Sequence, residues 1–175
     1  RSYQKAQASR GFYDVDLHLR LLSQRDDQAV ETEFVPAIRE FLRANSHQFS
    51  FPDSLPFLKA LRAGNWSVYV FTRGTRWFQF AKIQAIGVGE LLAGVRVISG
   101  ESKVPAIRSL VEKKGGVPFV FLDDSPRVVR DAREAFPTMQ IIQVRRYEDS
   151  PLPCTEASAS VQDLVDAFQL IESGC

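Results

Sequence analysis

The feature that most constrains this sequence is an alternation of short apolar runs with amphipathic stretches along most of its length. The apolar runs are rich in β-branched and aromatic residues, whereas the amphipathic stretches repeat apolar residues at helical spacing. Such an alternation predicts an α/β fold with a mostly parallel sheet, because a helix crosses over between successive strands. We expect a short first strand that ends at residues 14–16 and further strands at residues 66–71, 95–98, 119–122 and 139–144. We expect helices at residues 32–44, 54–63, 76–86, 104–114, 126–135 and 161–171.

The expected fold class is a Rossmann-like, three-layer α/β sandwich with a mostly parallel central sheet and a minimal helical insert after the first strand. Residues 119–122 are apolar on both faces, which is typical of a buried parallel strand. Residues 145–159 are polar and contain proline, so we expect a loop there. In such sheets ligands bind beyond the carboxyl ends of the strands, which makes those positions the ones to inspect.

Length and composition indicate one folded domain. The chain has 175 residues, of which 45% are hydrophobic and 25% are charged, and this is ordinary usage for a globular protein. We expect residues 1–10 to form a polar tail and residues 11–175 to form a single α/β domain. Residues 19–50 could form a small cap or insert within that domain.

The charge and cysteine content bear on the kinds of binding partner and on the cellular compartment. Lys and Arg number 22 against 21 Asp and Glu, and a net charge of +1 argues against a dedicated nucleic-acid or membrane-surface binder. No apolar run approaches the ~20 residues that a membrane helix needs. Cys154 and Cys175 lack a metal-binding spacing, so we expect two free thiols and a cytoplasmic protein.

Charged and hydroxyl-bearing residues gather where the expected strands end, or where the next helix begins. A sheet edge with this many polar groups is costly unless a ligand compensates their charge. Carboxylates are suited to a divalent cation, and a lysine with a hydroxyl is suited to a phosphoryl group, so the set suggests Mg²⁺-assisted phosphoryl transfer. In chain order the residues are Asp14, Asp16, Thr72, Lys103, Asp123 and Asp124.

The order of these motifs resembles that of the haloacid dehalogenase (HAD) superfamily of hydrolases and phosphotransferases. The resemblance covers roughly residues 10–145. Its strongest motif is FVFLDDSP, an apolar strand that ends in an acidic pair and is followed by a helix. The other motifs are the DxD of FYDVDLH, the threonine that ends VYVFT, and a lysine before a helix.

The resemblance implies a Mg²⁺-dependent phosphatase that acts on a phosphorylated substrate through an aspartyl-phosphate. Asp14 would be the nucleophile, and Asp16 would protonate the leaving group and later activate water. The phosphoryl oxygens would be bound by Thr72, by Arg73 and by Lys103. The residues that would hold the metal are Asp14, Asp16, Asp123 and Asp124.

One position departs from the family's pattern and keeps other functions open. His18 stands where the family usually has threonine, and the apolar run before Asp14 is short. A catalytically silent HAD-like domain used for binding or assembly is therefore the main alternative. A dehalogenase that uses the same aspartate on carbon without a metal is another. A response-regulator-like phosphoacceptor domain fits less well, because the acidic pair comes last in this chain.

The substrate entrance is expected near the residues that follow Thr72. Arg76 and Trp77 could line it, and arginines beside an aromatic ring would suit an anionic or planar substrate. His18 could also face the substrate. The interval between Asp14 and Thr72 leaves no room for a large cap, so we expect an open site or a lid of one helix.

Overall fold

A computed structural model of the chain describes Gln4 and residues 14–24, 27–48, 50–115, 119–146 and 152–174. The chain divides into two compact units. The first comprises Arg1–Pro52 and Arg62–Glu101, and the second comprises Asp53–Leu61 and Ser102–Cys175.

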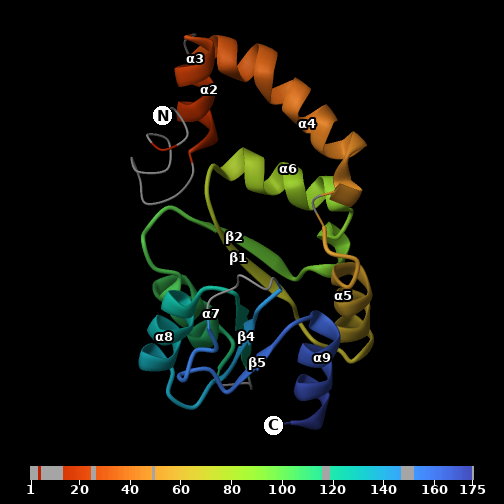
Figure 1. The fold of residues 1–175 in the computed structure, drawn as a ribbon, viewed down its shortest axis with the longest axis vertical. Coiled ribbons are helices and arrows are strands. Elements are labelled where there is room, and N and C mark those ends of the chain that lie inside the picture. Colours follow the sequence, from red (N-terminus) through yellow and green to blue (C-terminus); the bar gives the residue numbers. More distant parts are fainter. Residues whose placement is uncertain are drawn as a thin grey trace. The chain divides into compact units, whose positions relative to one another are not determined.

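The sheet of the first unit has two parallel strands, β1 (Tyr69–Arg73) and β2 (Gly94–Ile98) (Figure 1). They pair in register from Tyr69 with Gly94 to Arg73 with Ile98. The crossover between them is α6 (Arg76–Ile86) followed by the short 3₁₀ helix η3 (Gly89–Leu91). Gly87 ends α6 with a φ of 74°, a left-handed conformation that favours glycine.

The remaining helices of the first unit come before β1, and α4 packs against α6 (Figure 1). The side chain of Leu42 on α4 and that of Ala81 on α6 are buried. A helix was expected over residues 32–44, and the chain is helical there, with a π-helical first turn. In order these helices are α2 (Val15–Ser23), α3 (Asp27–Ala29), η1 (Val30–Phe34), α4 (Val35–Ala44) and η2 (Ser46–Gln48).

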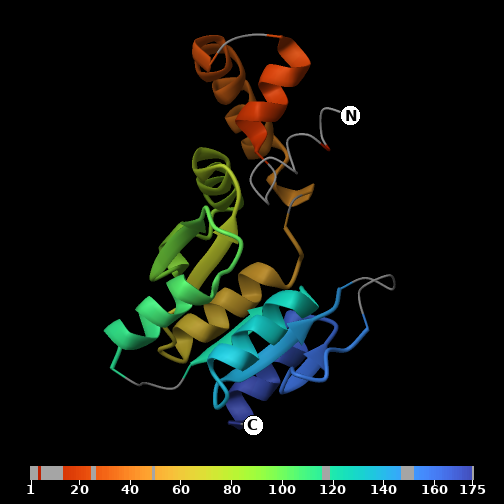
Figure 2. The same cartoon turned by 90° about the vertical axis from the view of Figure 1, so that its left-hand side faces the viewer.

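The second unit contains a three-stranded parallel sheet in the order β3 (Val120–Asp123), β4 (Gln140–Val144), β5 (Ala159–Val161). Figures 1 and 2 show helices on both faces of these strands, as in a three-layer sandwich. The side chains of Ile141 and Ile142 on β4 are fully buried. The helices are α5 (Ser54–Ala63), most of which lies in this unit, α7 (Val104–Lys113), α8 (Pro126–Ala135) and α9 (Leu164–Ser173).

The structure confirms an α/β fold whose described strands are all parallel, and it corrects three local expectations. The helix α2 begins at Val15, so Val15 and Asp16 do not end a strand. The strand β5 takes the end of the expected loop and the first residue of the expected last helix, which begins at Leu164 and not at Val161, because three residues are too few to show a period. Residues 120–122 are half-buried, and Asp123 is the buried residue of β3. The expected tail and residues 11–13 lie outside the described residues, except Gln4.

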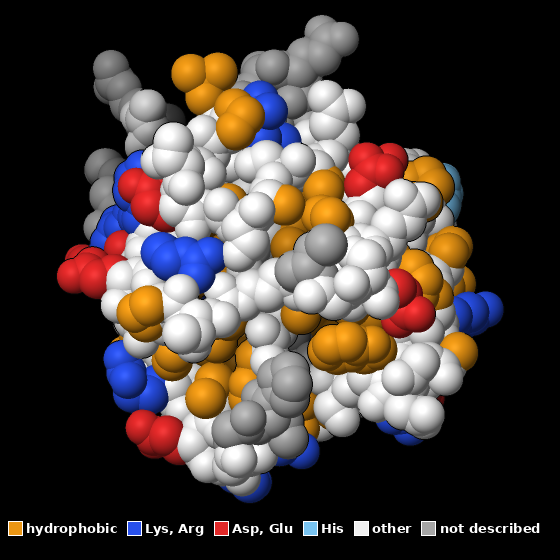
Figure 3. All heavy atoms as spheres, turned by 90° about the horizontal axis from the view of Figure 1, so that it is seen from below, with side chains coloured by type: hydrophobic (Ala, Val, Ile, Leu, Met, Phe, Trp, Pro, Cys, Tyr) orange, Lys and Arg blue, Asp and Glu red, His pale blue; other side chains and the backbone are white. Residues whose placement is uncertain are grey.

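Among the described residues, no helix is both long and apolar enough to cross a bilayer. On the face seen in Figure 3, Lys and Arg side chains are mixed with those of Asp and Glu, and hydrophobic side chains lie between them. This mixture agrees with the near-neutral charge of the whole chain.

Candidate active site

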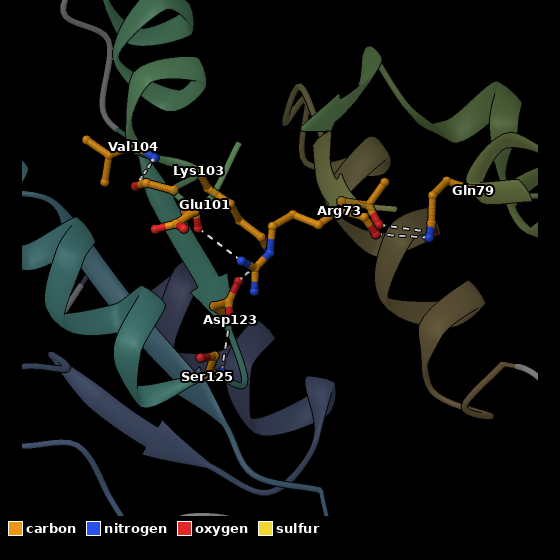
Figure 4. Close-up of polar contacts among 9 residues, drawn as sticks. Arg73, Gln79, Glu101, Lys103, Val104, Asp123 and Ser125 are labelled. Carbon is orange, nitrogen blue, oxygen red and sulfur yellow. Dashed lines mark hydrogen bonds and ion pairs between the residues drawn. The ribbon is translucent and has the colours of Figure 1, made fainter. Parts of the chain in front are cut away.

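The turn after β1 is shaped by a buried glutamine. The hydroxyl of Thr72 donates to Oε1 of Gln79 at 3.0 Å, and Nε2 of Gln79 donates to the carbonyl of Arg73 at 3.0 Å (Figure 4). Gly74 follows with a φ of 135°, and a Cβ there would lie 2.4 Å from Nε2 of Gln79. Glycine is therefore required both by the backbone conformation and by the close approach of this side chain.

Asp14 lies at the start of α2. It is the N-cap of the helix, is 4% exposed, and accepts a hydrogen bond on Oδ1 from the N–H of Leu17 at 3.0 Å. The N–H of Val15 donates to Oγ1 of Thr75 at 3.0 Å. A helix N-terminus stabilises negative charge, so the local fold is suited to a buried carboxylate at this position.

Asp16 lies in the first turn of α2 and is held by a tryptophan from α6. Nε1 of Trp77 donates to Oδ1 of Asp16 at 2.7 Å, which is a short bond of the charge-assisted kind. The two residues are 61 positions apart in the sequence, so tertiary packing alone brings them together.

Asp14 and Asp16 share one cavity with the turn after β1. Its volume is about 640 Å³, which is within the range of small-molecule sites. Arg39 from α4 and Arg76 from α6 bring positive charge to an otherwise acidic and aromatic lining. The lining residues, all in the first unit, are Asp14, Asp16, Arg39, Gly74, Thr75, Arg76, Trp77, Phe80, Val97 and Ser99.

The second unit contains the other predicted site residues. Nζ of Lys103 forms an ion pair with Oδ2 of Asp123 at 2.7 Å, and their side chains are 16% and 5% exposed (Figure 4). Oδ1 of Asp123 accepts from the N–H of Ser125 at 3.0 Å. Asp124 is exposed. Both oxygens of Asp123 thus have protein partners, whereas Asp124 faces solvent.

The structure therefore groups the predicted residues in two sets. Asp14 and Asp16 meet in the pocket of the first unit, and Lys103 meets Asp123 in the second unit. Thr72 and Arg73 do not line the pocket, since Thr72 donates to Gln79 and the Arg73 guanidinium donates to the carbonyl of Glu101 at 3.0 Å. Their phosphoryl-binding roles, like those of the other predicted site residues, remain predictions.

Sequence reasoning found Arg76 and Trp77 but missed several residues of the pocket. Thr75 could have been found, since it directly precedes the expected helix and is its N-cap. The other missed residues leave no comparable local signal. The missed residues are Arg39, Gly74, Thr75, Phe80, Val97 and Ser99. His18, considered as a substrate-facing residue, is not part of the lining described above.

The donor chemistry of the acids can be tested against a hard cation such as Mg²⁺. Carboxylate oxygens are the ligands that Mg²⁺ prefers. Each oxygen of Asp123 accepts one hydrogen bond, from Lys103 or from the Ser125 N–H, and keeps a further lone pair for a cation. Asp14, Asp16 and Asp124 fit by type. Within the described residues of either unit, no three His, Cys, Asp or Glu side chains form a metal site by themselves.

Comparison with solved structures identifies the fold. A haloacid dehalogenase-like hydrolase from Burkholderia xenovorans LB400 is similar over 95% of this chain and 79% of its own, with a TM-score of 0.70 and 18% identity. The L-2-haloacid dehalogenase RSc1362 is similar over 70% of this chain, with a TM-score of 0.59 and 18% identity. The L-2-haloacid dehalogenase from Xanthobacter autotrophicus is similar over 70%, with a TM-score of 0.55 and 16% identity.

The likeness is one of fold. The chain spans 56% of the length of RSc1362 and 61% of that of the Xanthobacter enzyme. No protein-family model matches the sequence, and neither does any curated protein.

Proposed function

Since the chain has the fold of the haloacid dehalogenase-like hydrolases, we propose that it is a hydrolase with Asp14 as nucleophile, acting on phosphate monoesters with Mg²⁺. The observation that carries the proposal is the cavity of about 640 Å³ that brings Asp14 and Asp16 together with two arginines. Two carboxylates and two cations on one small cavity suit an anionic substrate that needs both a nucleophile and a proton donor.

The proposed reaction has two halves. A carboxylate oxygen of Asp14 attacks phosphorus and forms an O–P bond as the bond from phosphorus to the ester oxygen breaks, and Asp16 gives a proton to the departing oxygen. Water then loses a proton to Asp16 and attacks phosphorus, and the bond to Asp14 breaks to release phosphate. The first half forms the covalent intermediate, and the second restores both acids.

Each residue of the pocket has a role that follows from its contacts. The N-terminus of α2 stabilises the negative charge of Asp14, so its carboxylate is held for attack. Arg39 and Arg76 are exposed cations on the lining and would attract an anionic substrate. The Asp14 carboxylate and the Asp16 backbone carbonyl are the candidates in this unit to hold Mg²⁺, which when bound would neutralise charge on the phosphoryl group, and Asp124 stays a ligand predicted from the sequence.

Dehalogenation is a second candidate, favoured by a specific observation. Two of the similar structures are L-2-haloacid dehalogenases, and in this chain both oxygens of Asp123 already have protein partners. In this reaction Asp14 would attack the carbon that bears the halogen and form an ester as halide departs. Water would then hydrolyse the ester, and no metal would be needed.

A paired assay separates these functions. Phosphate release from p-nitrophenyl phosphate and halide release from 2-chloropropionate are measured with Mg²⁺ and with EDTA. We expect metal-dependent phosphate release that falls at least about a thousandfold in Asp14→Asn. Asparagine caps a helix as well as aspartate does, so the variant should remain folded. The matched control is Asp163→Asn, the same change at the N-cap of α9.

The other results have equally definite meanings. Halide release that survives EDTA and is lost in Asp14→Asn would replace the phosphatase by the dehalogenase. Activity on either substrate that survives Asp14→Asn would remove Asp14 as nucleophile. Inactivity of the wild type toward both substrates would favour the catalytically silent domain.

A further inference from the structure

The N-terminus of α6 lies beside the N-terminus of α2 (Figure 1) and makes two hydrogen bonds to it, immediately after Asp14. Oγ1 of Thr75 accepts from the N–H of Val15 at 3.0 Å, and Nε1 of Trp77 donates to Oδ1 of Asp16 at 2.7 Å. We propose that Trp77 is a positioning residue, which fixes the orientation of the Asp16 carboxyl so that only Oδ2 exchanges protons with the substrate. This inference rests on the function proposed above.

The hydroxyl of Thr75 is used across the interface and not within its own helix. Thr75 is the N-cap of α6, yet its side chain makes no capping hydrogen bond there. Instead it satisfies the N–H of Val15, one of the first-turn donors that a helix cannot satisfy itself. The two helix starts are thereby tied by a hydrogen bond that is independent of Trp77.

The chemistry of the indole decides which oxygen of Asp16 is left for the reaction. An indole N–H can only donate, and so it requires Oδ1 of Asp16 to act as an acceptor. A carbonyl oxygen accepts better than a carboxyl hydroxyl, so a proton carried by Asp16 is favoured on Oδ2. Because Asp16 and Trp77 both line the cavity, this arrangement presents the same oxygen to each substrate molecule.

The ring of Trp77 is itself held in place. It packs edge-to-face against Phe78, with ring centroids 5.6 Å apart and planes at 72°. Nζ of Lys82 in turn lies 5.1 Å from the centroid of the Phe78 ring. A donor on a ring that is fixed in this way can orient a carboxyl group, whereas a donor on a mobile side chain would move with it.

The test compares a poor leaving group with a good one. The phenoxide that leaves from phenyl phosphate is more basic than p-nitrophenoxide, so its departure depends more on a proton from Asp16. Misplacing this proton donor should therefore slow the hydrolysis of phenyl phosphate more. We expect Trp77→Phe to lower kcat for phenyl phosphate about tenfold or more and kcat for p-nitrophenyl phosphate less than about threefold, with little change in KM. Trp66→Phe, the same change at the other tryptophan, should leave both rates unaltered.

Other kinetic outcomes would overturn the inference. An equal loss for both esters would mean that Trp77 supports the fold of the pocket without orienting Asp16. The double variant Trp77→Phe/Asp16→Asn should be no slower than Asp16→Asn alone, and additive losses would show that the two residues act separately. If Trp77→Phe does not fold, the Trp isostere benzothienylalanine removes the N–H and keeps the ring shape.

A spectroscopic arm tests the contact even if the proposed function fails. The chain has two tryptophans, so the ¹⁵N–¹H spectrum should contain two indole peaks, which Trp66→Phe assigns. Asp16→Asn should move the Trp77 peak, whereas Ser99→Ala, a change elsewhere on the lining, should not. Inactivity of the wild type toward both esters would refute the phosphatase alone, and an unmoved Trp77 peak would refute the inference alone.

Discussion

Two turns of this molecule end in extended N-caps and differ in what holds them. One joins β1 to α6 through Gly74 and Thr75, and the other joins β3 to α8 through Asp124 and Ser125. Thr75 and Ser125 are extended N-caps, with φ and ψ of −63° and 123° and of −83° and 118°, and neither side chain caps its own helix. Each turn presents polar groups beyond the carboxyl end of a strand.

The difference lies in the charge of the contacts that hold each turn. Gln79 holds the first turn by neutral hydrogen bonds to the hydroxyl of Thr72 and the carbonyl of Arg73. Lys103 holds the second by an ion pair with Asp123. A neutral network tolerates changes of pH and salt, whereas a partly buried ion pair loses its benefit when one partner is removed. The comparison therefore predicts that different substitutions destabilise the two turns: loss of a charged partner in the second, and loss of space or of a neutral hydrogen bond in the first.

The largest expected effect is on the charged turn. Asp123→Ala leaves the Lys103 ammonium half-buried without its partner, and we expect about 3 kcal/mol of lost unfolding free energy by urea denaturation. Asp124→Ala, at an exposed neighbour, should change it by less than about 0.5 kcal/mol. Lys103→Met combined with Asp123→Ala should recover part of the loss. Equal losses in the two aspartate variants would refute the distinction.

The next effect concerns the glycine of the neutral turn. Gly74→Ala places a Cβ against Nε2 of Gln79 at a φ of 135°, and we expect a loss of about 2–3 kcal/mol from strain and a displaced glutamine. Gly89→Ala is the control, since a Cβ there meets nothing within 4 Å. If both alanine variants are as stable as the wild type, the turn after β1 is not limited by this contact.

A smaller effect is expected when the hydroxyl of Thr72, which donates to Oε1 of Gln79, is removed. Thr72→Val keeps the shape and removes the donor, so we expect a loss of about 1 kcal/mol, independent of salt concentration. Thr72→Ser keeps the donor and should lose less. Loss of catalysis with unchanged stability in Thr72→Val would contradict this expectation and would support the phosphoryl-binding role predicted for Thr72.

The smallest effect is a pH dependence in the second unit. Burial by itself would raise the pKa of Asp53, but hydrogen bonds from Arg146 and the Leu164 N–H outweigh it and leave the pKa below its ordinary value of 3.8. The unfolded chain then binds more protons, so this stabilisation is present above about pH 4 and is lost as the pH falls further. Asp53→Asn should flatten the stability profile between about pH 4 and 2.

Amide hydrogen exchange can show that the pH dependence arises at the start of α9, where Asp53 binds the Leu164 N–H. Amides at the start of α9 should lose protection below about pH 4 in the wild type, because Asp53 binds the Leu164 N–H, whereas amides of β1 should follow only the intrinsic exchange rate. Unchanged protection at the start of α9 would mean that Asp53 and Arg146 contribute too little to detect.

The helices could be predicted closely from the sequence. The helices α5, α6 and α8 begin and end where periodicity, Pro126 and Gly87 placed them. The start of α2 could not, because an acidic pair after apolar residues is equally typical of a strand end. Asp14 caps that helix, and its next two residues are bound from some sixty positions away, Val15 by Thr75 and Asp16 by Trp77.

The sequence by itself determined the order of strands and helices and the placing of Asp14, Asp16, Asp123 and Asp124 near strand ends or helix starts. These are consequences of local periodicity and of turn residues. Only the tertiary structure decided which groups meet the acids. The hydroxyl of Thr75, at the N-cap of α6, binds α2, whereas that of Thr72, within β1, donates to Gln79. Asp123, and not Asp124, pairs with Lys103, because the last residue of β3 is buried and the next one faces solvent.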